Sequence, residues 1–508
     1  MLNKLYSMGV SGMDAFLVEV ETYVSGGLPR FDIVGLPDTA VKESKERVRS
    51  SIKNQGYEYP VSRITVNLAP ADVKKTGPLY DLPILLSILL AEQKGKVHTA
   101  DSIFIGELSL SGDVRPAVGI LPMVIGARQL GFKKIYVPAG NAAEGSVVDG
   151  IEVYPVTDVR TLMEHLLGVA PLSPVCAEDF PQQNEPTYLD FADVKGQYFA
   201  KRALEVAAAG GHNVLMIGPP GSGKSMLASR LPSILPKMTF EESIETTKIH
   251  SIAGQLPAGT PLIKIRPFRS PHHTVSNVAL SGGGTIPKPG EVSLAHNGVL
   301  FLDELPEFSR SAIEGLRQPI EDGKVSIARV ATTLTYPCNV MLVAAMNPCP
   351  CGYFGHPTRP CTCAQGAATK YMHRVSGPLL DRLDIHVEVP PVEYDQISSR
   401  EKGEPSVVIR ERVNKAREIQ LKRYAGTGIL NNAALSAPHL QTFCPLTDDA
   451  KEMMRKVFDS LALSARGHDR ILKVARTIAD LEGSDIITAD HVAEAVQYRS
   501  LDRKYWRT

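Results

Sequence analysis

Residues 218–225 read GPPGSGKS and directly follow the apolar run NVLMI of residues 213–217. Glycines at this spacing let backbone N–H groups converge on phosphates, the lysine reaches the β- and γ-phosphates, and the serine hydroxyl binds Mg²⁺. A strand, a glycine-rich loop and a helix are the context that this chemistry needs, which disfavours a chance glycine-rich turn. The predicted ATP-binding residues are Gly218, Pro219, Pro220, Gly221, Ser222, Gly223, Lys224 and Ser225, with Ser225 also a Mg²⁺ ligand.

Two more apolar runs end on polar residues, GVLFLDELPEF at 298–308 and NVMLVAAMN at 339–347. Asp303 is expected to hold Mg²⁺, and Glu304 to orient and deprotonate the attacking water. Alone, the two acids are equally typical of a solvated strand end, but a phosphate loop upstream favours catalysis. Asn347 ends the third strand. Ligands of open parallel sheets bind beyond the carboxyl ends of the strands, where all three runs place their polar residue.

Composition limits the remaining possibilities. At 508 residues the chain is long enough for about three domains. Lys and Arg number 55, as do Asp and Glu, so a nucleic-acid surface has to be local. The amino-terminal residues show no secretory pattern, and the longest apolar run, 82–91, is far below the ~20 residues of a membrane span. We therefore expect a cytoplasmic protein with no membrane partner.

The pattern along the chain indicates four segments. Alternating strands and helical patterns over 1–168 predict an α+β domain, and the proline-rich stretch over 169–190 predicts a linker. Residues 191–395 predict a parallel α/β core. Residues 396–508 have helical periodicity, with Thr447 and Thr488 as expected helix starts, which predicts an all-helical carboxy-terminal domain.

With these motifs, residues 191–508 as a whole resemble an AAA+ ATPase of the magnesium-chelatase-like branch. In that family the asparagine at Asn347 senses the γ-phosphate. SGPLLDRLDIHVEVP, at 376–390, is similar to the segment carrying the arginine finger, which falls on Arg382; local pairing with Asp381 or Asp384 is the alternative. The resemblance also implies that residues 396–508 form the helical lid domain of this family. Within it SARGHDRILKVAR, at 464–476, resembles the second sensor, with Arg466 the first choice and Arg470 the second. A finger acting on a neighbouring subunit implies self-association into a ring, and these rings are usually hexamers.

The front domain resembles a Lon-protease domain through DVKKTGPLYDLPILLSILLA at 72–91. The proteolytic family has a serine after Gly-Pro and a later lysine, where this chain has Leu79 and Leu121. Because leucine can neither attack a carbonyl nor accept a proton, we expect no peptidase activity.

The combination of this front domain with FRSPHHTVSNVALSGGGTIPKPGEVSLAHNGVLFLDELPEF, at 268–308, resembles the YifB/ComM family over essentially the whole chain. ComM proteins are ring helicases that promote branch migration when DNA is integrated during natural transformation. The resemblance implies an ATP-dependent motor on single-stranded or branched DNA. The alternative is a chelatase-like or chaperone-like ATPase that remodels a protein complex.

A predicted hairpin, GKVSIARVATTLTYP at 323–337, resembles the pre-sensor hairpin of minichromosome-maintenance helicases. Arg329 takes the place of the basic residue that meets DNA phosphates, and an ordinary hairpin arginine bonded to an acid is the alternative. The loop at 265–290 adds Arg266, Arg269, His272 and His273 as candidates for DNA or subunit contact.

Four of the seven cysteines lie in NPCPCGYFGHPTRPCTC at 347–363, as two Cys-x-Cys pairs. In a reducing compartment clustered cysteines are more often metal ligands than disulfides, and four thiolates suit tetrahedral Zn²⁺ in a structural site. The predicted ligands are Cys349, Cys351, Cys361 and Cys363 in an insert at 349–363, with His356 a possible replacement for one of them. Free thiols or a redox pair remain the alternative.

Overall fold

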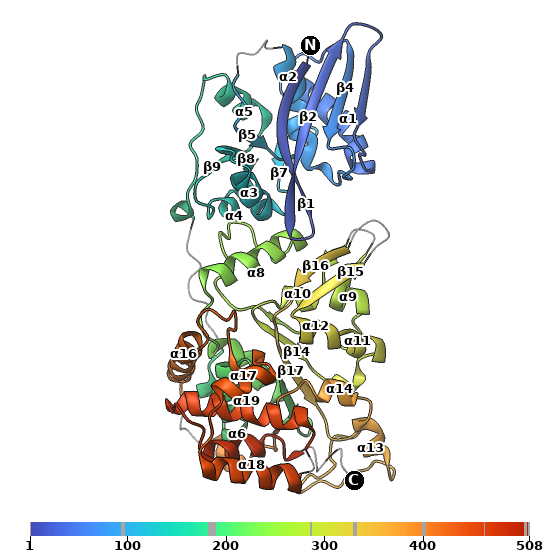
Figure 1. The fold of residues 1–508 in the computed structure, drawn as a ribbon. Coiled ribbons are helices and arrows are strands. Elements are labelled where there is room, and N and C mark those ends of the chain that lie inside the picture. The colour runs from blue at the N-terminus through green and yellow to red at the C-terminus, as the bar shows by residue number, and fades with distance from the viewer. Residues whose placement is uncertain are drawn as a thin grey trace. The chain divides into compact units, whose positions relative to one another are not determined.

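The computed structural model describes residues 2–92, 97–180, 189–284, 287–328, 333–398, 403–461, 463–501 and 505. The chain divides into two compact units (Figure 1). The first comprises Met1–Asn184 with Ser243–Ile263, and the second comprises Glu185–Glu242 with Lys264–Thr508. Within the described ranges, no helix is long and apolar enough to cross a membrane.

The first unit contains a mixed sheet with the strand order β3-β4-β2-β1-β5-β8-β9. The β1–β2 and β2–β4 pairs are antiparallel, and the other neighbours are parallel. The strands of the unit, including the small β6–β7 pair, are β1 (Leu2–Ser11), β2 (Asp14–Ser25), β3 (Arg30–Val34), β4 (Arg63–Ala69), β5 (Ser102–Phe104), β6 (Glu107–Leu108), β7 (Val114–Arg115), β8 (Lys134–Pro138) and β9 (Glu152–Val156).

Helices cover both faces of this sheet. Successive side chains of a strand point to opposite faces, so Phe104 joins the apolar cluster under α1, α2 and α5, whereas Ile103 and Ile105 join the cluster under α3 and α4. The helices are α1 (Thr39–Asn54), α2 (Asp81–Glu92), α3 (Ile120–Gln129), α4 (Ala142–Gly145) and α5 (Val159–Leu166). The expected α+β architecture of the front domain is confirmed.

The first unit also contains a segment from the middle of the chain. Helix α8 (Phe240–Ala253) starts in the second unit, but Ser243–Ile263 folds with the first. Ser251 donates its hydroxyl to the buried carboxylate of Glu144 (2.5 Å) and accepts the N–H of Gly119 (3.2 Å) at its carbonyl. Part of the segment expected as a linker packs here too, because Leu172 and Val175 contact the apolar clusters of this unit.

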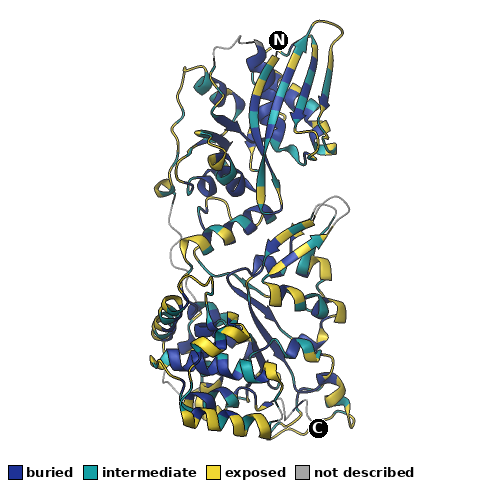
Figure 2. Ribbon diagram, viewed as in Figure 1, coloured by how far each residue is buried: buried dark blue, intermediate teal, exposed yellow. Residues whose placement is uncertain are grey.

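The second unit is built on a parallel sheet with the order β11-β14-β17-β10-β18. β10, β14 and β17 are buried along their whole length (Figure 2). Strands whose two faces are both covered consist of near-continuous apolar residues, as these do. The sheet strands are β10 (Val214–Ile217), β11 (Phe268–Arg269), β14 (Val299–Leu302), β17 (Met341–Met346) and β18 (Ile385–Glu388). The predicted parallel core is confirmed.

The two faces of this sheet lie in different apolar clusters. Val214 and Met216 of β10 pack with α6 and the carboxy-terminal helices, whereas Leu215 and Ile217 pack with α9, α10 and α11. The remaining helices of the core are α6 (Tyr198–Gly210), α7 (Lys224–Arg230), α9 (Asn277–Ser281), α10 (Glu291–Leu294), α11 (Arg310–Gly315), α12 (Arg317–Asp322), α13 (Ala367–Met372), α14 (Gly377–Leu380) and α15 (Tyr394–Ser398).

The carboxy-terminal region is helical, as expected. Thr447 caps α18, its hydroxyl accepting the N–H of Ala450, and Thr488 is the N-cap of α20. The helices of this region are α16 (Ser406–Arg423), α17 (Ala437–Phe443), α18 (Asp448–Ser460), α19 (Ala465–Glu482) and α20 (Ala489–Gln497).

The second unit also contains two hairpins, β12 (Gly282–Gly283) with β13 (Lys288–Pro289), and β15 (Lys324–Ala328) with β16 (Thr333–Pro337). The second is the hairpin expected before the third core strand. Arg329 lies outside the described residues.

Candidate active site

The phosphate loop connects β10 to α7, so the sheet itself positions it. Gly218 has to be glycine, because a Cβ there would lie 2.2 Å from the carbonyl oxygen of Val389. Gly223, with φ of +94°, caps the start of α7 in the left-handed region that favours glycine. The loop and the helix N-terminus therefore follow β10 in the arrangement that the motif requires.

Lys224 is buried in this loop. Its Nζ donates to the carbonyls of Gly218 (2.8 Å) and Pro219 (3.0 Å) and to Oδ1 of Asn347 (3.2 Å). Because an ammonium group has three donors, each has an acceptor here. Burial lowers the pKa of Lys224 to about 8. The structure thus brings the lysine of the phosphate loop to the asparagine that ends the third strand.

The two carboxylates after β14 have different surroundings. Asp303 accepts the hydroxyl of Ser225 at Oδ2 (2.6 Å), so the two predicted Mg²⁺ ligands are in contact. Glu304 has a left-handed backbone (φ +52°), uncommon for a residue with a side chain, and its carboxylate lies 3.2 Å from Nδ1 of His273. Strained backbone of this kind is concentrated at functional sites. No motif or spacing predicts the Glu304–His273 contact.

Arg382 lies at the other end of the sheet from the phosphate loop. It precedes β18, where Asn213, the residue before β10, donates to its carbonyl (3.0 Å). Four residues of β10 separate that end from Gly218, or about 13 Å of strand. The Arg382 guanidinium bonds Glu321 and the carbonyl of Pro378 (2.7 Å). The acids considered as its local partners, Asp381 and Asp384, instead pair with Arg470 at 3.5 and 3.6 Å.

Helix α19 is bonded to the same end of the sheet. Buried His212 lies 3.2 Å from Asp384 and 2.8 Å from the Thr477 hydroxyl of α19. Burial opposes ionisation of Asp384, but the hydrogen bond with His212 holds the pKa of this carboxyl below its usual value. Arg466, in the first turn of α19, is exposed. Of the two candidate sensors, Arg466 therefore faces solvent in a single chain, whereas Arg470 pairs with Asp381 and Asp384.

Two arginines of the loop at 265–290 are held by acids within the unit. Arg266 pairs with Glu242 (2.8 Å) and Arg269 makes a two-pronged contact with Glu291 (2.7 and 2.8 Å). The His272 and His273 rings are in contact at a tilt of 34°, with centroids 4.1 Å apart.

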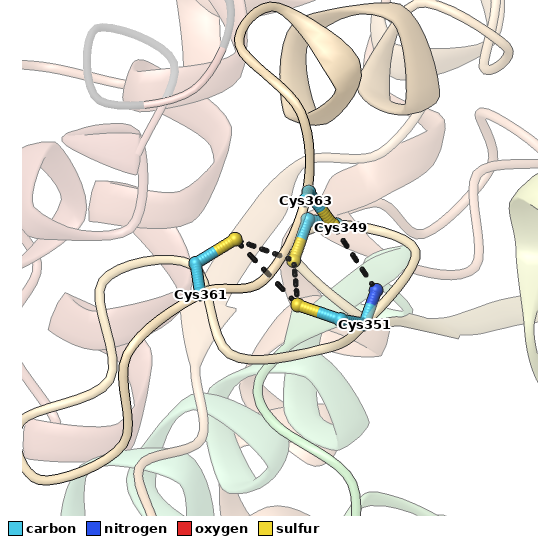
Figure 3. A group of neighbouring side chains, drawn as sticks. All are labelled: Cys349, Cys351, Cys361 and Cys363. Atoms are coloured by element: carbon cyan, nitrogen blue, oxygen red, sulfur yellow. Dashed lines mark hydrogen bonds between the residues drawn. The ribbon is translucent and has the colours of Figure 1, made fainter.

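The four predicted zinc ligands come together (Figure 3). Their sulfur atoms all lie within 4.8 Å of one another, with Cys349 3.4 Å from Cys351 and 3.7 Å from Cys361. Sulfurs around a tetrahedral Zn²⁺ with bonds of about 2.3 Å lie about 3.8 Å apart, whereas a disulfide is about 2.05 Å long. The cluster is compatible with a zinc site. His356 is no part of it, because its Nδ1 accepts the N–H groups of Thr358 and Arg359.

Fold and site together define an AAA+ P-loop ATPase. Three family models match the chain: subunit ChlI of Mg-chelatase over residues 20–141, magnesium chelatase subunit ChlI over 190–397, and its C-terminal model over 403–499. The chain belongs to this magnesium-chelatase ChlI-like family, and membership supports an ATPase activity.

Similarity to individual proteins narrows the assignment of the chain within this family. The chain is 43% identical to Competence protein ComM of Haemophilus influenzae over 504 residues, which cover 98% of this chain and 97% of that protein. It is also 43% identical to the uncharacterized protein YifB of Escherichia coli over 507 residues, 99% of this chain and 98% of YifB. A Lon protease of Mycolicibacterium smegmatis is 23% identical over 174 residues, 32% of this chain and 22% of the protease. The resemblance to the YifB/ComM family is confirmed.

Proposed function

We propose that this chain is an ATP-hydrolysing ring motor on DNA, a branch-migration helicase that promotes DNA integration during natural transformation. The observation that carries the proposal is the convergence of Lys224, the Ser225–Asp303 contact, Glu304 and Asn347 at the carboxyl ends of three adjacent parallel strands. The near full-length likeness to a protein named for competence supports DNA as the substrate.

The donor set at Ser225 and Asp303 fits Mg²⁺, because a hydroxyl and a carboxylate in contact are the hard oxygen ligands that this cation prefers. When bound, Mg²⁺ neutralises charge on the β- and γ-phosphates of ATP. Lys224 binds the same phosphates as a cation. Glu304 orients the attacking water and takes its proton, and Asn347 bonds the γ-phosphate in place of its present bond with Lys224.

Arg382 serves as the arginine finger of a neighbouring subunit. About 13 Å of strand lies between its end of the sheet and the phosphate loop of its own chain, so action on a second chain is the arrangement that fits. Arg466, exposed at the start of α19, is available as the second sensor. Together these placements support a ring, which we propose to be a hexamer, in which each ATP lies between two subunits.

The β15–β16 hairpin provides the DNA contact, through Arg329 next in sequence after β15. A cation on such a hairpin attracts the phosphates of single-stranded or branched DNA in a salt-dependent manner. The two arginines paired with Glu242 and Glu291 are neutralised locally and are weaker candidates.

The four cysteines hold a structural Zn²⁺. The N–H of Cys351 donates to Cys363 Sγ (3.4 Å). Such donors are typical of thiolates that bind metal. Elemental analysis of protein purified without chelator is expected to give one zinc per chain, and its absence would refute the site.

The deciding experiment is steady-state ATP hydrolysis without DNA, with single-stranded DNA and with a branched substrate, using Glu304→Gln as the inactive control. We expect stimulation that is strongest with the branched substrate and that falls with salt. Wild-type activity that ignores every DNA would favour remodelling of a protein complex instead.

A further inference from the structure

The four-cysteine loop touches the phosphate loop directly. A Cβ built at Gly352 would lie 2.4 Å from Cδ and 2.6 Å from Cγ of Pro220, closer than real Cβ atoms come. Gly352 also has a φ of +83°, in the left-handed region. Only a glycine allows the backbone between Cys351 and Tyr353 to lie against the Pro220 ring.

A second path connects the same two segments. Cys349 is fully buried and follows Asn347 by two residues, and Asn347 accepts the Nζ of Lys224 (3.2 Å). The N–H of Gly352 donates to the carbonyl of Cys349 (2.9 Å), closing a tight turn between the first cysteine and the contact with Pro220. The loop therefore meets the phosphate loop at Pro220, while Asn347, two residues before the loop, meets it at Lys224.

The four cysteines bring the two ends of the loop together. The described contacts among Cys349, Cys351 and Cys361 are between sulfur atoms 3.4 to 3.7 Å apart, which are weak in thiols. A tetrahedral ion replaces them by four metal–sulfur bonds that fix both ends of residues 349–363. A fixed Gly352 in turn limits where Pro220 can move.

We propose that metal occupancy of the four-cysteine site controls nucleotide binding, with Gly352 the contact that holds Pro220 and the phosphate loop in their binding conformation. The inference rests on the proposed metal and nucleotide sites and adds a regulatory link between them. Pre-organisation raises apparent affinity because binding no longer has to select the competent conformation from a mixture.

The test measures the Kd of a fluorescent ADP in excess Mg²⁺, together with zinc content, for the full chain. Removing zinc with a zinc-selective chelator is expected to raise the Kd about tenfold, with recovery on adding Zn²⁺ back. Cys351→Ser, which removes a ligand and leaves Gly352 unchanged, is expected to lose zinc and affinity together.

Gly352→Ala separates the contact from the metal. It is expected to retain zinc and to bind ADP about tenfold more weakly, because the new methyl group displaces Pro220. Gly355→Ala is the matched control: Gly355 lies in the same loop with φ of +73°, but a Cβ there meets nothing within 4 Å. Gly355→Ala is expected to bind ADP nearly as the unaltered chain does.

Each failure has its own pattern. Equal ADP affinity in the Gly352 and Gly355 variants, or no change on removing zinc, overturns the regulatory link. Protein that contains no zinc when purified without chelator, and that binds ADP no more tightly after Zn²⁺ is added, overturns the metal site and the link with it, while the nucleotide site stands. Zinc-loaded protein that binds no ADP overturns the nucleotide site.

Discussion

Nδ1 of His273 lies 3.2 Å from Oε2 of Glu304, although α9, the β12–β13 hairpin, α10 and β14 lie between the two residues in the chain. An imidazole at this distance competes with the attacking water for the same carboxylate oxygen. Glu304 is half-exposed and has a left-handed backbone, so its side chain is not fixed by packing alone. We infer that the contact with His273 lowers the fraction of time in which the Glu304 carboxylate is free to bind the attacking water.

Replacing His273 by alanine is therefore expected to raise basal kcat for ATP hydrolysis by about two- to tenfold, with little change in KM, because Glu304 is freed while the phosphate contacts stay. His272→Ala is the control, since His272 bonds Thr274 and not Glu304. A fall in kcat specific to the His273 variant would show instead that the pair orients the base.

Mixing variants tests whether Arg382 acts on a neighbouring subunit. Arg382→Ala and Glu304→Gln are each expected to lose at least about 100-fold in kcat, because one lacks the finger and the other the base. In mixed rings an Arg382→Ala subunit retains its own Glu304 and receives a finger from a Glu304→Gln neighbour. Recovery of part of the activity on mixing is the expected result, and no recovery at any ratio would contradict a site shared between chains.

The lowered pKa of Lys224 makes nucleotide binding pH-dependent. With its pKa near 8, part of the lysine is uncharged above that pH, and phosphate charge favours the ammonium form. Binding is therefore expected to take up protons near pH 8 and above, and to lose this contribution roughly two pH units lower, where Lys224 is already charged. Calorimetry of ADP binding in buffers with different ionisation enthalpies measures the uptake, and Lys224→Arg, always charged, should abolish it.

The front domain is expected to cleave no peptide. Leu121 is fully buried, and its N–H bonds the carboxylate of Glu144 (3.1 Å), so it provides neither a nucleophile nor a base. Leu79→Ser alone is expected to leave casein intact, because Leu121 stands where the proteolytic family has its lysine. Casein cleavage by the unaltered protein that disappears on changing this domain would be the contrary result.

Local patterns were sufficient for the elements of the fold. The apolar runs before Gly218, Asp303 and Asn347 are β10, β14 and β17, and Thr447 and Thr488 begin helices, because strands buried on both faces and N-caps leave direct marks in the sequence. The cysteine cluster was also visible, since its ligands lie close together in the chain.

Contacts between distant segments were not predictable in this way. His273 with Glu304, and Gly352 with Pro220, join residues 31 and 132 positions apart, and no periodicity or spacing relates them. Arg382 was expected to pair with Asp381 or Asp384 if it was not a finger, but the fold brings Glu321 to it and Arg470 to those acids. The assignment of Arg329 to DNA stays a prediction.

The placement of Ser243–Ile263 in the first unit has a consequence for the evolution of the gene. A gene fragment beginning at residue 185 would encode Ser251 but neither Glu144 nor Gly119, the residues to which it bonds. Recombination between related genes at the domain border near residue 190 would therefore combine an α8 from one protein with a front domain from another. The contacts between them would then no longer match. The two parts are expected to descend as one unit, with Ser251 and Glu144 varying together across species.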